Sequence, residues 1–296
     1  MAMGSAVQGG TYRLSSKRWA KRTAWLSKHR VFVVELLILV VFLSVSVGGP
    51  WLVTTKPEEQ ILARMRERPN AGALLGRDEL GRDILARLVH GSRYTLGIGF
   101  TTVMIGLVCG GALGLISGYY GKWADVLIMR VMDMMLAFPS ILLAIVMIAI
   151  LGAGLLNVVV AVGIYFIPIF ARLVRALTLR LREEQFVTAA RATGARDHRI
   201  ILRHLLPNVL PTLVVQATVS LAEGILYVTG LGFLGLGVQA PTPEWGVMLS
   251  RARDVMFVAP HVAIMPGLAL TLLLLTINLL GDALRDLLDP RLRGSR

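Results

Sequence analysis

Five runs of apolar residues, each about long enough to cross a bilayer, dominate this sequence. A bilayer core about 30 Å thick is crossed by about 20 apolar helical residues. The runs cover residues 31–53, 94–118, 134–171, 209–236 and 262–281. The chain is 55% hydrophobic and only 17% charged, which is more apolar surface than soluble cores in 296 residues hold. We therefore expect lipid to surround much of the chain.

The run over residues 134–171 is too long for one helix. Gly152-Ala153-Gly154, with Asn157 close by, predicts a break that divides it into two spans, the first beginning near Val126. The sequence thus predicts an all-α polytopic membrane protein with six transmembrane helices. Arg130 and Asp133 lie three residues apart in the third span, so we expect them to pair with each other.

The basic residues indicate an orientation in the membrane. Residues 1–30 hold seven Lys/Arg and no acid, residues 172–204 hold eight Arg and three acids, and residues 282–296 hold four Arg and three Asp. Six spans place all three segments on one side, and the positive-inside rule makes that side the cytoplasm. These segments account for the net charge of +13, so nucleic acid is not needed as a partner. Residues 54–93 carry eight Lys/Arg and six acids, and we interpret them as an extracytoplasmic insertion.

Several polar or small residues within the predicted spans are candidates for function. Gly106, Gly110, Gly114 and Gly118 place a glycine stripe on one face of the second span, either for packing within this chain or for contact with a partner subunit. Glu223 is the only acid deep within a span, where it costs at least about 2.5 kcal/mol unless it is paired or wetted.

We interpret Glu223 and Asn157 as candidate residues of a substrate pathway, with a structural role as the alternative. Pro139, Pro168 and Pro211 predict kinks in or beside spans, either near such a pathway or as purely structural features.

Motifs for catalysis or cofactor binding are absent from the sequence. Gly230, Gly232 and Gly235 match G-x-G-x-x-G, but a membrane helix precedes them where the dinucleotide fingerprint needs a strand. Gly121-Lys122 lacks the rest of a phosphate-binding loop, and the five histidines show no metal-ligand spacing. Cys109 is the single cysteine, which allows no disulfide within the chain. We predict no catalytic residue, no metal site and no cofactor on this chain.

The loop after the fourth span predicts two short helices. It reads EEQFVTAARATGARDHRIILRHLLPN over residues 183–208. Phe186, Ala189, Ala190 and Thr193 form one stripe, Gly194 ends the first helix, and Pro207 is expected to stop the second at residue 206. A short helix with small residues on one face can sit in a groove of another protein. The alternative is a surface helix lying on lipid headgroups.

This loop resembles the EAA loop of permease subunits in binding-protein-dependent ABC importers. The matching residues are Ala189, Ala190, Gly194, Leu206 and Pro207, whereas Thr188 and His204 stand where the family pattern has Glu and Ile. Further similar segments are GRDELGRDILARL, GYYGKWADVLIMRVMDMMLAFPSILLA, GFLGLGVQAPTPEWGVML and NLLGDALRDLLDPRLR. They are similar to the dipeptide, oligopeptide and glutathione branch of the family, over roughly residues 30–293.

The resemblance implies the type I ABC importer, or MetI-like, transmembrane domain. The expected organisation is a cytoplasmic leader at 1–30, a first span at 31–53, an extracytoplasmic insertion at 54–93, a five-helix permease core at 94–281 and a cytoplasmic tail at 282–296.

Within the core, the coupling loop covers 183–207. The ATPase-coupling residues carried over from the resemblance are Phe186, Val187, Ala189, Ala190, Arg191, Gly194, Ala195, Arg196 and His198. Of these, Arg191 and Arg196 are expected to face acidic groups of the ATPase.

The resemblance also implies partners and a location. A homologous second permease would complete the pathway, two cytoplasmic ATPases would bind ATP and Mg, and an extracytoplasmic solute-binding protein would deliver substrate. The location would be the bacterial plasma membrane, with membrane lipid around the spans. The permease itself would be non-catalytic.

Three other interpretations stay open at this point. The same machinery serves nickel or another non-peptide solute, because specificity in such systems rests largely with the binding protein. A channel or secondary transporter would differ by working without ATPases, although no internal repeat typical of many such transporters is visible. An intramembrane enzyme is disfavoured by the missing catalytic residues.

Overall fold

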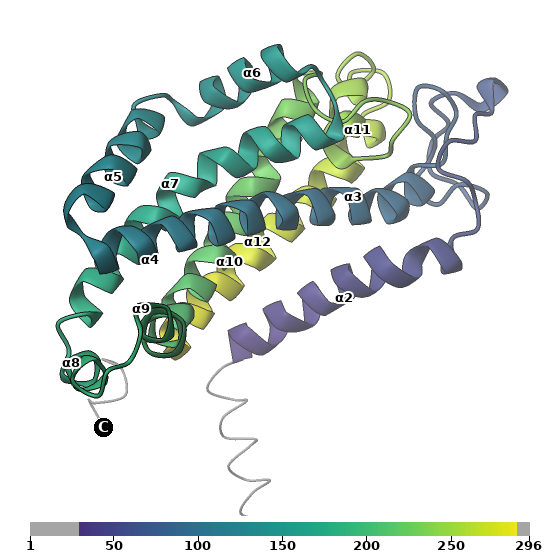
Figure 1. Cartoon of the computed structure of the whole chain (residues 1–296). Coiled ribbons are helices and arrows are strands. Elements are labelled where there is room, and N and C mark those ends of the chain that lie inside the picture. Colours follow the sequence, from purple (N-terminus) through teal and green to yellow (C-terminus); the bar gives the residue numbers. More distant parts are fainter. Residues whose placement is uncertain (1–29, 289–296) are drawn as a thin grey trace, which may run out of the picture.

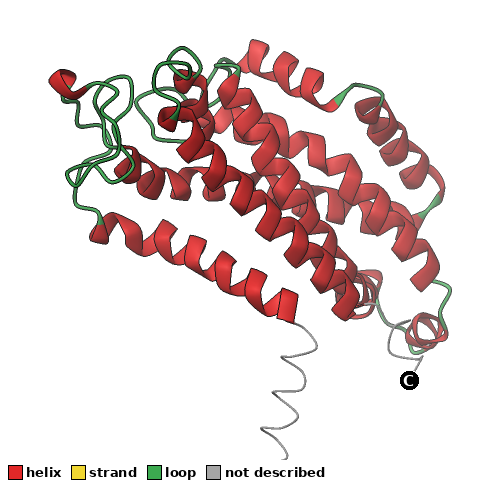
Figure 2. Ribbon diagram, turned by 180° about the vertical axis from the view of Figure 1, so that it is seen from behind, coloured by secondary structure: helices red, strands yellow, loops and turns green. Residues whose placement is uncertain are grey.

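The computed structural model describes residues 30–288, and within this range every regular element is helical. The predicted leader therefore lies outside the described residues except for its last position, as does the end of the predicted tail, residues 289–296. The elements are α2 (Arg30–Leu52), η1 (Leu62–Arg64), α3 (Ile84–Ile105), η2 (Gly106–Gly110), α4 (Gly111–Tyr120), α5 (Lys122–Leu136), α6 (Ser140–Leu151), α7 (Leu155–Leu181), α8 (Gln185–Ala192), α9 (Asp197–Ile200), η3 (Ile201–Leu205), α10 (Leu206–Phe233), α11 (Trp245–Ala252) and α12 (His261–Leu288). Figures 1 and 2 show long helices running side by side, with most loops gathered at one end.

Five helices are long and apolar enough to cross a membrane, and a sixth span exists if the bent pair α5–α6 counts as one. The five are Phe32–Leu52, Ile84–Tyr120, Leu155–Leu181, Asp197–Phe233 and His261–Leu287. The predicted all-α polytopic architecture is confirmed, including the break at Gly152, where the backbone adopts φ +87° and α6 ends.

The third predicted span is bent where the sequence predicts a kink, but more sharply than a kink. The expected helix beginning near Val126 is divided into α5 and α6, which meet at an angle of 92°. The break falls at Pro139, whose φ of −56° and ψ of 133° leave the helical region. Proline cannot donate to the preceding turn, and it disfavours helical geometry in Phe138 before it. The bend therefore follows from one residue within an otherwise apolar run.

Two other expectations about helices are wrong. Pro207 does not stop a helix, because Asp197–Phe233 continue as one helix through it. The π-helical segment η3 comes just before this proline and widens the turn that its ring would otherwise contact. Asp133 does not pair with Arg130 but forms an ion pair with Arg172 of α7, so it joins two elements.

The second span is longer than predicted. Helix α3 begins at Ile84, ten residues before the apolar run, and Asp83 caps it by accepting a hydrogen bond from the Ala86 amide at 2.9 Å. The helix continues through the π segment η2 into α4 and ends at Tyr120. Residues 84–93, which the sequence pattern places in the insertion, are thus the first turns of a long helix.

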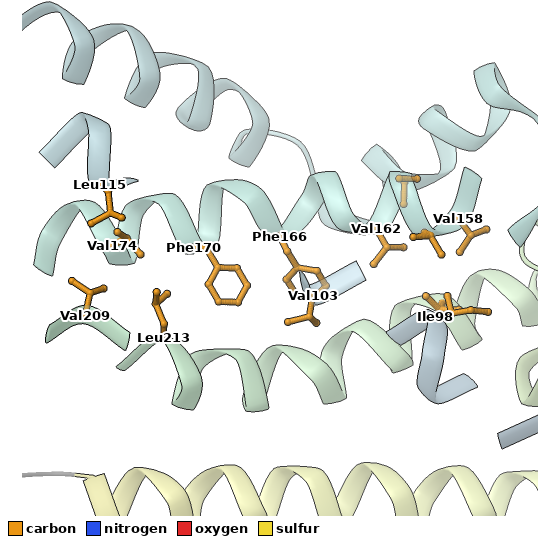
Figure 3. Close-up of a cluster of buried hydrophobic side chains, with 14 of the residues drawn as sticks. Ile98, Val103, Leu115, Val158, Val162, Phe166, Phe170, Val174, Val209 and Leu213 are labelled. Carbon is orange, nitrogen blue, oxygen red and sulfur yellow. The ribbon is translucent and has the colours of Figure 1, made fainter. Parts of the chain in front are cut away.

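Helix α7 lies at the centre of the bundle. It packs against α3, η2 and α4, and also against α6 and α10. Phe166 and Phe170 on α7 are fully buried, with Val103 of α3 and Leu213 of α10 in the same cluster (Figure 3). A second cluster, formed by α3, α10, α11 and α12, surrounds the buried indole of Trp245. These clusters hold the long helices in one unit.

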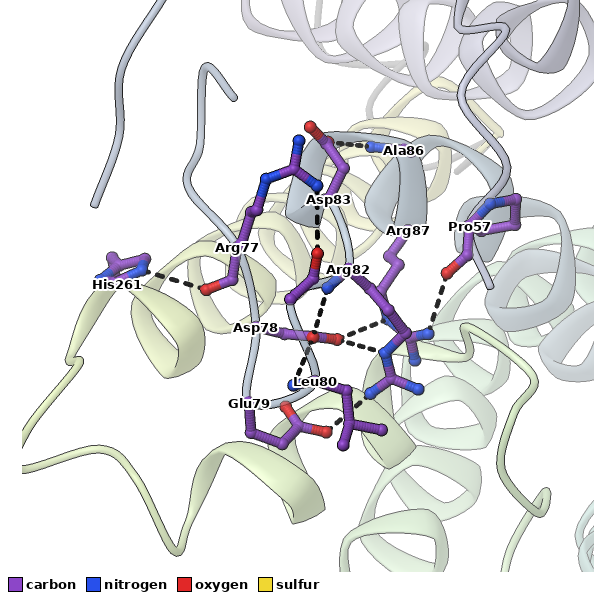
Figure 4. Close-up of polar contacts among 11 residues, drawn as sticks. Pro57, Arg77, Asp78, Glu79, Leu80, Arg82, Asp83, Ala86, Arg87 and His261 are labelled. Atoms are coloured by element: carbon purple, nitrogen blue, oxygen red, sulfur yellow. Dashed lines mark hydrogen bonds and ion pairs between the residues drawn. The ribbon is translucent and has the colours of Figure 1, made fainter. Parts of the chain in front are cut away.

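Buried charges organise the loop that joins α2 to α3. The Asp78 carboxylate lies 2.6 Å from Arg82 Nε and 3.5 Å from Arg87 Nε, and all three side chains are at most 4% exposed (Figure 4). His261 Nε2, at the start of α12, lies 3.3 Å from the Arg77 carbonyl oxygen. The loop is therefore fixed to the ends of α3 and α12 at the end of the bundle opposite α8 (Figure 1).

Candidate functional site

The first candidate site is the surface helix α8, which projects at the end of the bundle where α7 finishes (Figure 1). Val187 is its one fully buried residue and fixes the helix to the bundle. Six of the predicted coupling residues are exposed, on α8 and in the turn and short helix that follow it, while Ala190 and Ala195 are half-buried; the six are Phe186, Ala189, Arg191, Gly194, Arg196 and His198. The predicted loop thus presents a helix of small side chains to its surroundings.

The C-terminus of α8 is fixed by a Schellman motif. The Gly194 amide donates to the Arg191 carbonyl at 2.9 Å, and the Ala195 amide donates to the Ala190 carbonyl at 3.0 Å. Gly194 has φ +78°, a left-handed conformation that glycine adopts without a β-carbon penalty. The chain can therefore turn sharply from α8 into α9.

Tyr119, at the end of α4, connects α8 and α9 to the bundle. Its hydroxyl donates to Asp197 Oδ1 at 2.7 Å, and the Arg191 guanidinium lies 5.3 Å from its ring centroid. A guanidinium at that distance from an aromatic face is attracted by the ring quadrupole. Phe186 contacts the ring of His204, with centroids 6.5 Å apart. Sequence reasoning missed Tyr119, because no local pattern shows that α4 ends beside α8.

A network of hydrogen bonds around the Asp125 carboxylate involves the residues of α4 just before Tyr119. Asp125 of α5 accepts two hydrogen bonds from Arg175 of α7, at 2.5 and 2.6 Å, and one from Ser117 of α4 at 2.5 Å. Arg182 donates to the Gly118 carbonyl at 3.0 Å. Charge-assisted hydrogen bonds of this kind are stronger than neutral ones. They tie α4, α5 and α7 together where α7 leads into α8.

The glycine stripe faces α7 within this chain. A β-carbon on Gly110 would lie 2.3 Å from the Ile167 carbonyl oxygen, and one on Gly114 would lie 2.5 Å from the Ala171 carbonyl oxygen. Gly106 and Gly118 would meet the β-carbons of Phe166 and Thr178, at 2.3 and 2.6 Å. The backbones of α4 and α7 therefore approach more closely than larger side chains would allow.

Comparison with known sequences now identifies the family. Residues 110–294, more than half of the chain, match the binding-protein-dependent transport system inner membrane component. This chain belongs to that family. As such an ABC permease it works with an ATPase and a solute-binding protein, and ATP hydrolysis is carried out by the separate ATPase subunits.

Relatives of this permease extend over almost its whole length. It is 45% identical to the dipeptide transport system permease protein DppC of Alkalihalophilus pseudofirmus, over 93% of this chain and 91% of the relative. It is 44% identical to the glutathione transport system permease protein GsiD of Pectobacterium atrosepticum, over 92% and 93%. It is also 46% identical to the di/tripeptide transport system permease protein DppC of Pseudomonas aeruginosa, over 88% of each chain.

The permease is also similar in fold to a solved transporter. An inward-facing structure of the MetNI methionine ABC transporter aligns with a TM-score of 0.54 and 24% identity, covering 68% of this chain and 96% of the solved one. The MetI-like fold expected from the sequence is therefore confirmed, and the permease is a multi-pass component of the inner membrane.

The second candidate site of the permease surrounds Glu223, midway along α10. Glu223 is exposed in this chain, and Tyr227 lies one helical turn further on. The Tyr227 ring meets that of Tyr165 on α7 edge-on, with centroids 5.2 Å apart. Ser140 Oγ, at the start of α6, donates to the Tyr227 hydroxyl at 3.1 Å. Sequence reasoning found Glu223 but missed these neighbours, although the spacing of Glu223 and Tyr227 puts them on one helix face.

Asn157 lies apart from Glu223, near the start of α7. Its side-chain amide donates to the carbonyls of Leu151 and Gly152, at 2.7 and 2.9 Å. The last carbonyls of a helix lack partners within it, so this side chain caps α6. The structure therefore does not bring the two predicted pathway residues together.

No cluster of three or more metal-ligating side chains occurs among residues 30–288 of the permease. The buried carboxyl of Glu244 instead serves the fold. It caps α11 by accepting a hydrogen bond from the Val247 amide at 2.9 Å, and it lies 3.4 Å from the Thr95 hydroxyl of α3. Burial raises the pKa of this carboxyl above its usual range.

Proposed function

We propose that this permease is one of two homologous membrane subunits of an ATP-driven importer for small peptides, in the dipeptide or glutathione size range. The observation that supports it is 44–46% identity over about nine-tenths of the chain to permeases of dipeptide and glutathione transport systems. Substrate would cross by alternating access between the two permeases, while the ATPases bind ATP and Mg.

The test of this proposal is uptake by the reconstituted complex. Proteoliposomes that contain the permease, its second permease and the ATPases would be supplied with ATP inside and with the loaded binding protein outside. Radiolabelled dialanine should accumulate, and vanadate should stop it. Uptake of nickel in place of peptide would contradict the proposed substrate class, and uptake that persists without the ATPases would contradict the proposed mechanism.

The orientation proposed for the permease places α8 and both termini in the cytoplasm, and the loop at 54–83 outside. The Lys/Arg bias of residues 172–204 supports it. In a C109A background, Thr193→Cys next to α8 should resist an impermeant maleimide in intact cells, and Leu74→Cys should react, since both positions are exposed. Labelling of Thr193→Cys in intact cells would contradict this orientation and indicate the opposite one.

Helix α8 is the element we propose to contact the ATPase, through its exposed residues from Phe186 to His198. The sharp turn at Gly194 supports this role, because it leaves the small side chains of α8 projecting from the bundle. Gly194→Asp should leave the permease inserted but separate ATP hydrolysis from peptide uptake, since it adds charge and bulk at this surface and strains the left-handed backbone.

Gly235, two residues after the C-terminal end of α10, provides a matched control for the Gly194 substitution. Gly235 has φ +77°, and a β-carbon added to it, like one added to Gly194, would have no atom within 4 Å. Gly235→Asp therefore adds the same charge and similar backbone strain away from α8. If both variants lost the same amount of uptake per ATP hydrolysed, α8 would have no special role in coupling.

The substrate pathway is proposed to include Glu223 within the bilayer and Asn157 at the turn between α6 and α7. The exposed position of Glu223 within an otherwise uncharged helix supports the first assignment. Glu223→Ala should lower uptake without lowering the amount of assembled complex. Unchanged uptake would leave Glu223 with a structural role only.

A further inference from the structure

A carboxylate without a partner lies in the middle of α10. Glu223 is exposed in this chain, and its carboxylate makes no hydrogen bond or ion pair within residues 30–288. It lies well inside the helix Leu206–Phe233, away from both ends. An acid at such a depth costs about 2.5 kcal/mol or more unless a positive group or water meets it. Something outside the described chain must therefore face this side chain.

Glu223 shares one face of α10 with Tyr227, and side chains from two other helices contact that tyrosine. Tyr227 follows on the same face of α10, Tyr165 comes from α7, and Ser140 comes from the first residue of α6, immediately after the bend. Both tyrosines are only partly buried. Aromatic faces attract cations, and phenol and serine oxygens accept hydrogen bonds from ammonium groups.

The three helices that carry this cluster supply no positive charge to it. Helices α6 and α10 contain neither Lys nor Arg, and the first basic residue of α7 is Arg172, two turns beyond Tyr165 and paired with Asp133. A single carboxylate beside two phenols also lacks the ligand set of a metal site. The chemistry of the cluster favours an organic ammonium group.

We propose that Glu223, Tyr165 and Tyr227 form a binding site for the α-ammonium group of the transported substrate. This inference rests on the proposed peptide-importing function. The carboxylate supplies the charge, the two rings supply aromatic surface, and Ser140 holds the Tyr227 hydroxyl in place.

The experiment compares a peptide with an analogue that lacks only the amino group. The full complex in proteoliposomes takes up dialanine or N-propionylalanine, each at a concentration that saturates the binding protein. The variants are Glu223→Gln, Glu223→Asp and the matched control Glu35→Gln, which neutralises an acid in α2 instead. Assembled complex and ATP hydrolysis stimulated by the loaded binding protein are measured in parallel.

The expected result is a loss of discrimination. Wild type and E35Q take up dialanine about tenfold faster than the analogue, consistent with one charge-assisted contact. E223Q lowers dialanine uptake to the rate of the analogue and leaves the analogue's rate unchanged, while E223D restores most of the difference.

Four outcomes would overturn the inference. Equal loss for both solutes would mean that Glu223 shapes the pathway without recognising the ammonium group. A lower yield of assembled E223Q complex would mean that the carboxylate pairs with the second permease. If wild type transported dialanine no faster than the analogue, recognition of the amino group would be refuted while the proposed function would stand. If wild type took up no dialanine at all, both the ammonium site and the proposed function would be contradicted.

Discussion

Replacing Gly110, the last residue of η2 before α4, by alanine tests the close contact of this long helix with α7. The new β-carbon would lie 2.3 Å from the Ile167 carbonyl oxygen and 2.9 Å from the Phe170 β-carbon. An ordinary carbon–oxygen contact is about 3.3 Å or longer, so α7 must move away by about 1 Å. Neither obstacle is the end of a flexible side chain. We expect a loss of about 1–3 kcal/mol, the usual cost of overpacking.

Gly111 is the matched control for this substitution. It is the next residue along, and a β-carbon there has no atom within 4 Å. Both glycines have right-handed helical dihedrals, with φ of −65° and −59°. Alanine therefore improves helix propensity by the same amount, up to about 1 kcal/mol, at either position. The difference between the two variants isolates the contact with α7.

The measurement is reversible unfolding of the purified permease in mixed micelles, followed by tryptophan fluorescence. Gly111→Ala should match or exceed wild type, and Gly110→Ala should be less stable than Gly111→Ala by about 1–3 kcal/mol. Equal stability of the two variants would refute the close approach of α4 to α7. If Gly110→Ala instead left the isolated chain intact and only reduced pairing with the second permease, the stripe would belong to a subunit interface.

Three further predictions concern single side chains. Asp78→Asn should destabilise the permease by about 3–5 kcal/mol, because the buried Arg87 loses its counter-charge and the buried Arg82 keeps only Glu79, and a thermal melt unchanged from wild type would contradict this. Glu244→Gln should flatten the pH dependence of Tm: burial raises the pKa of this carboxyl, so its stabilising contribution is present below the ordinary glutamate pKa and is lost as pH rises through the raised value. Tyr119→Phe should lower peptide uptake per ATP hydrolysed with little change in Tm, and adding Asp197→Asn should cause no further loss if their hydrogen bond carries the effect.

The sequence was sufficient for features that depend on local chemistry. Apolar length predicts the helices that can cross a membrane, and the glycines at 152 and 154 mark the break before α7 because they adopt conformations that other residues avoid. The end of α8 at Gly194 was predictable for the same reason. Each of these follows from a few neighbouring residues.

Features that depend on distant contacts were not predictable. Asp133 has a basic residue three positions earlier, yet its partner is Arg172, which α7 brings alongside α5. Pro207 has the usual sequence signature of a helix end, but the π-helical turn before it lets the helix continue. Tyr119 and Asp197 lie 78 residues apart, and only the packed fold makes them neighbours. For Asp133 and Tyr119 the packed fold decides the partner, and for Pro207 the backbone geometry of the preceding turn decides that the helix continues.

The connection through Tyr119 has a mechanical consequence. The chain itself attaches α8 to α7 before it and to α9 after it. The buried Val187 and the stacking of Arg191 on Tyr119 add attachments to the bundle, the second of them to α4. A helix held only at its two ends can rotate about the line that joins them, whereas a further attachment off that line fixes its orientation. We therefore expect a partner that tips α8 to turn α4, α7 and α10 together, so that the direction of its motion as well as its size reaches the interior of the bundle.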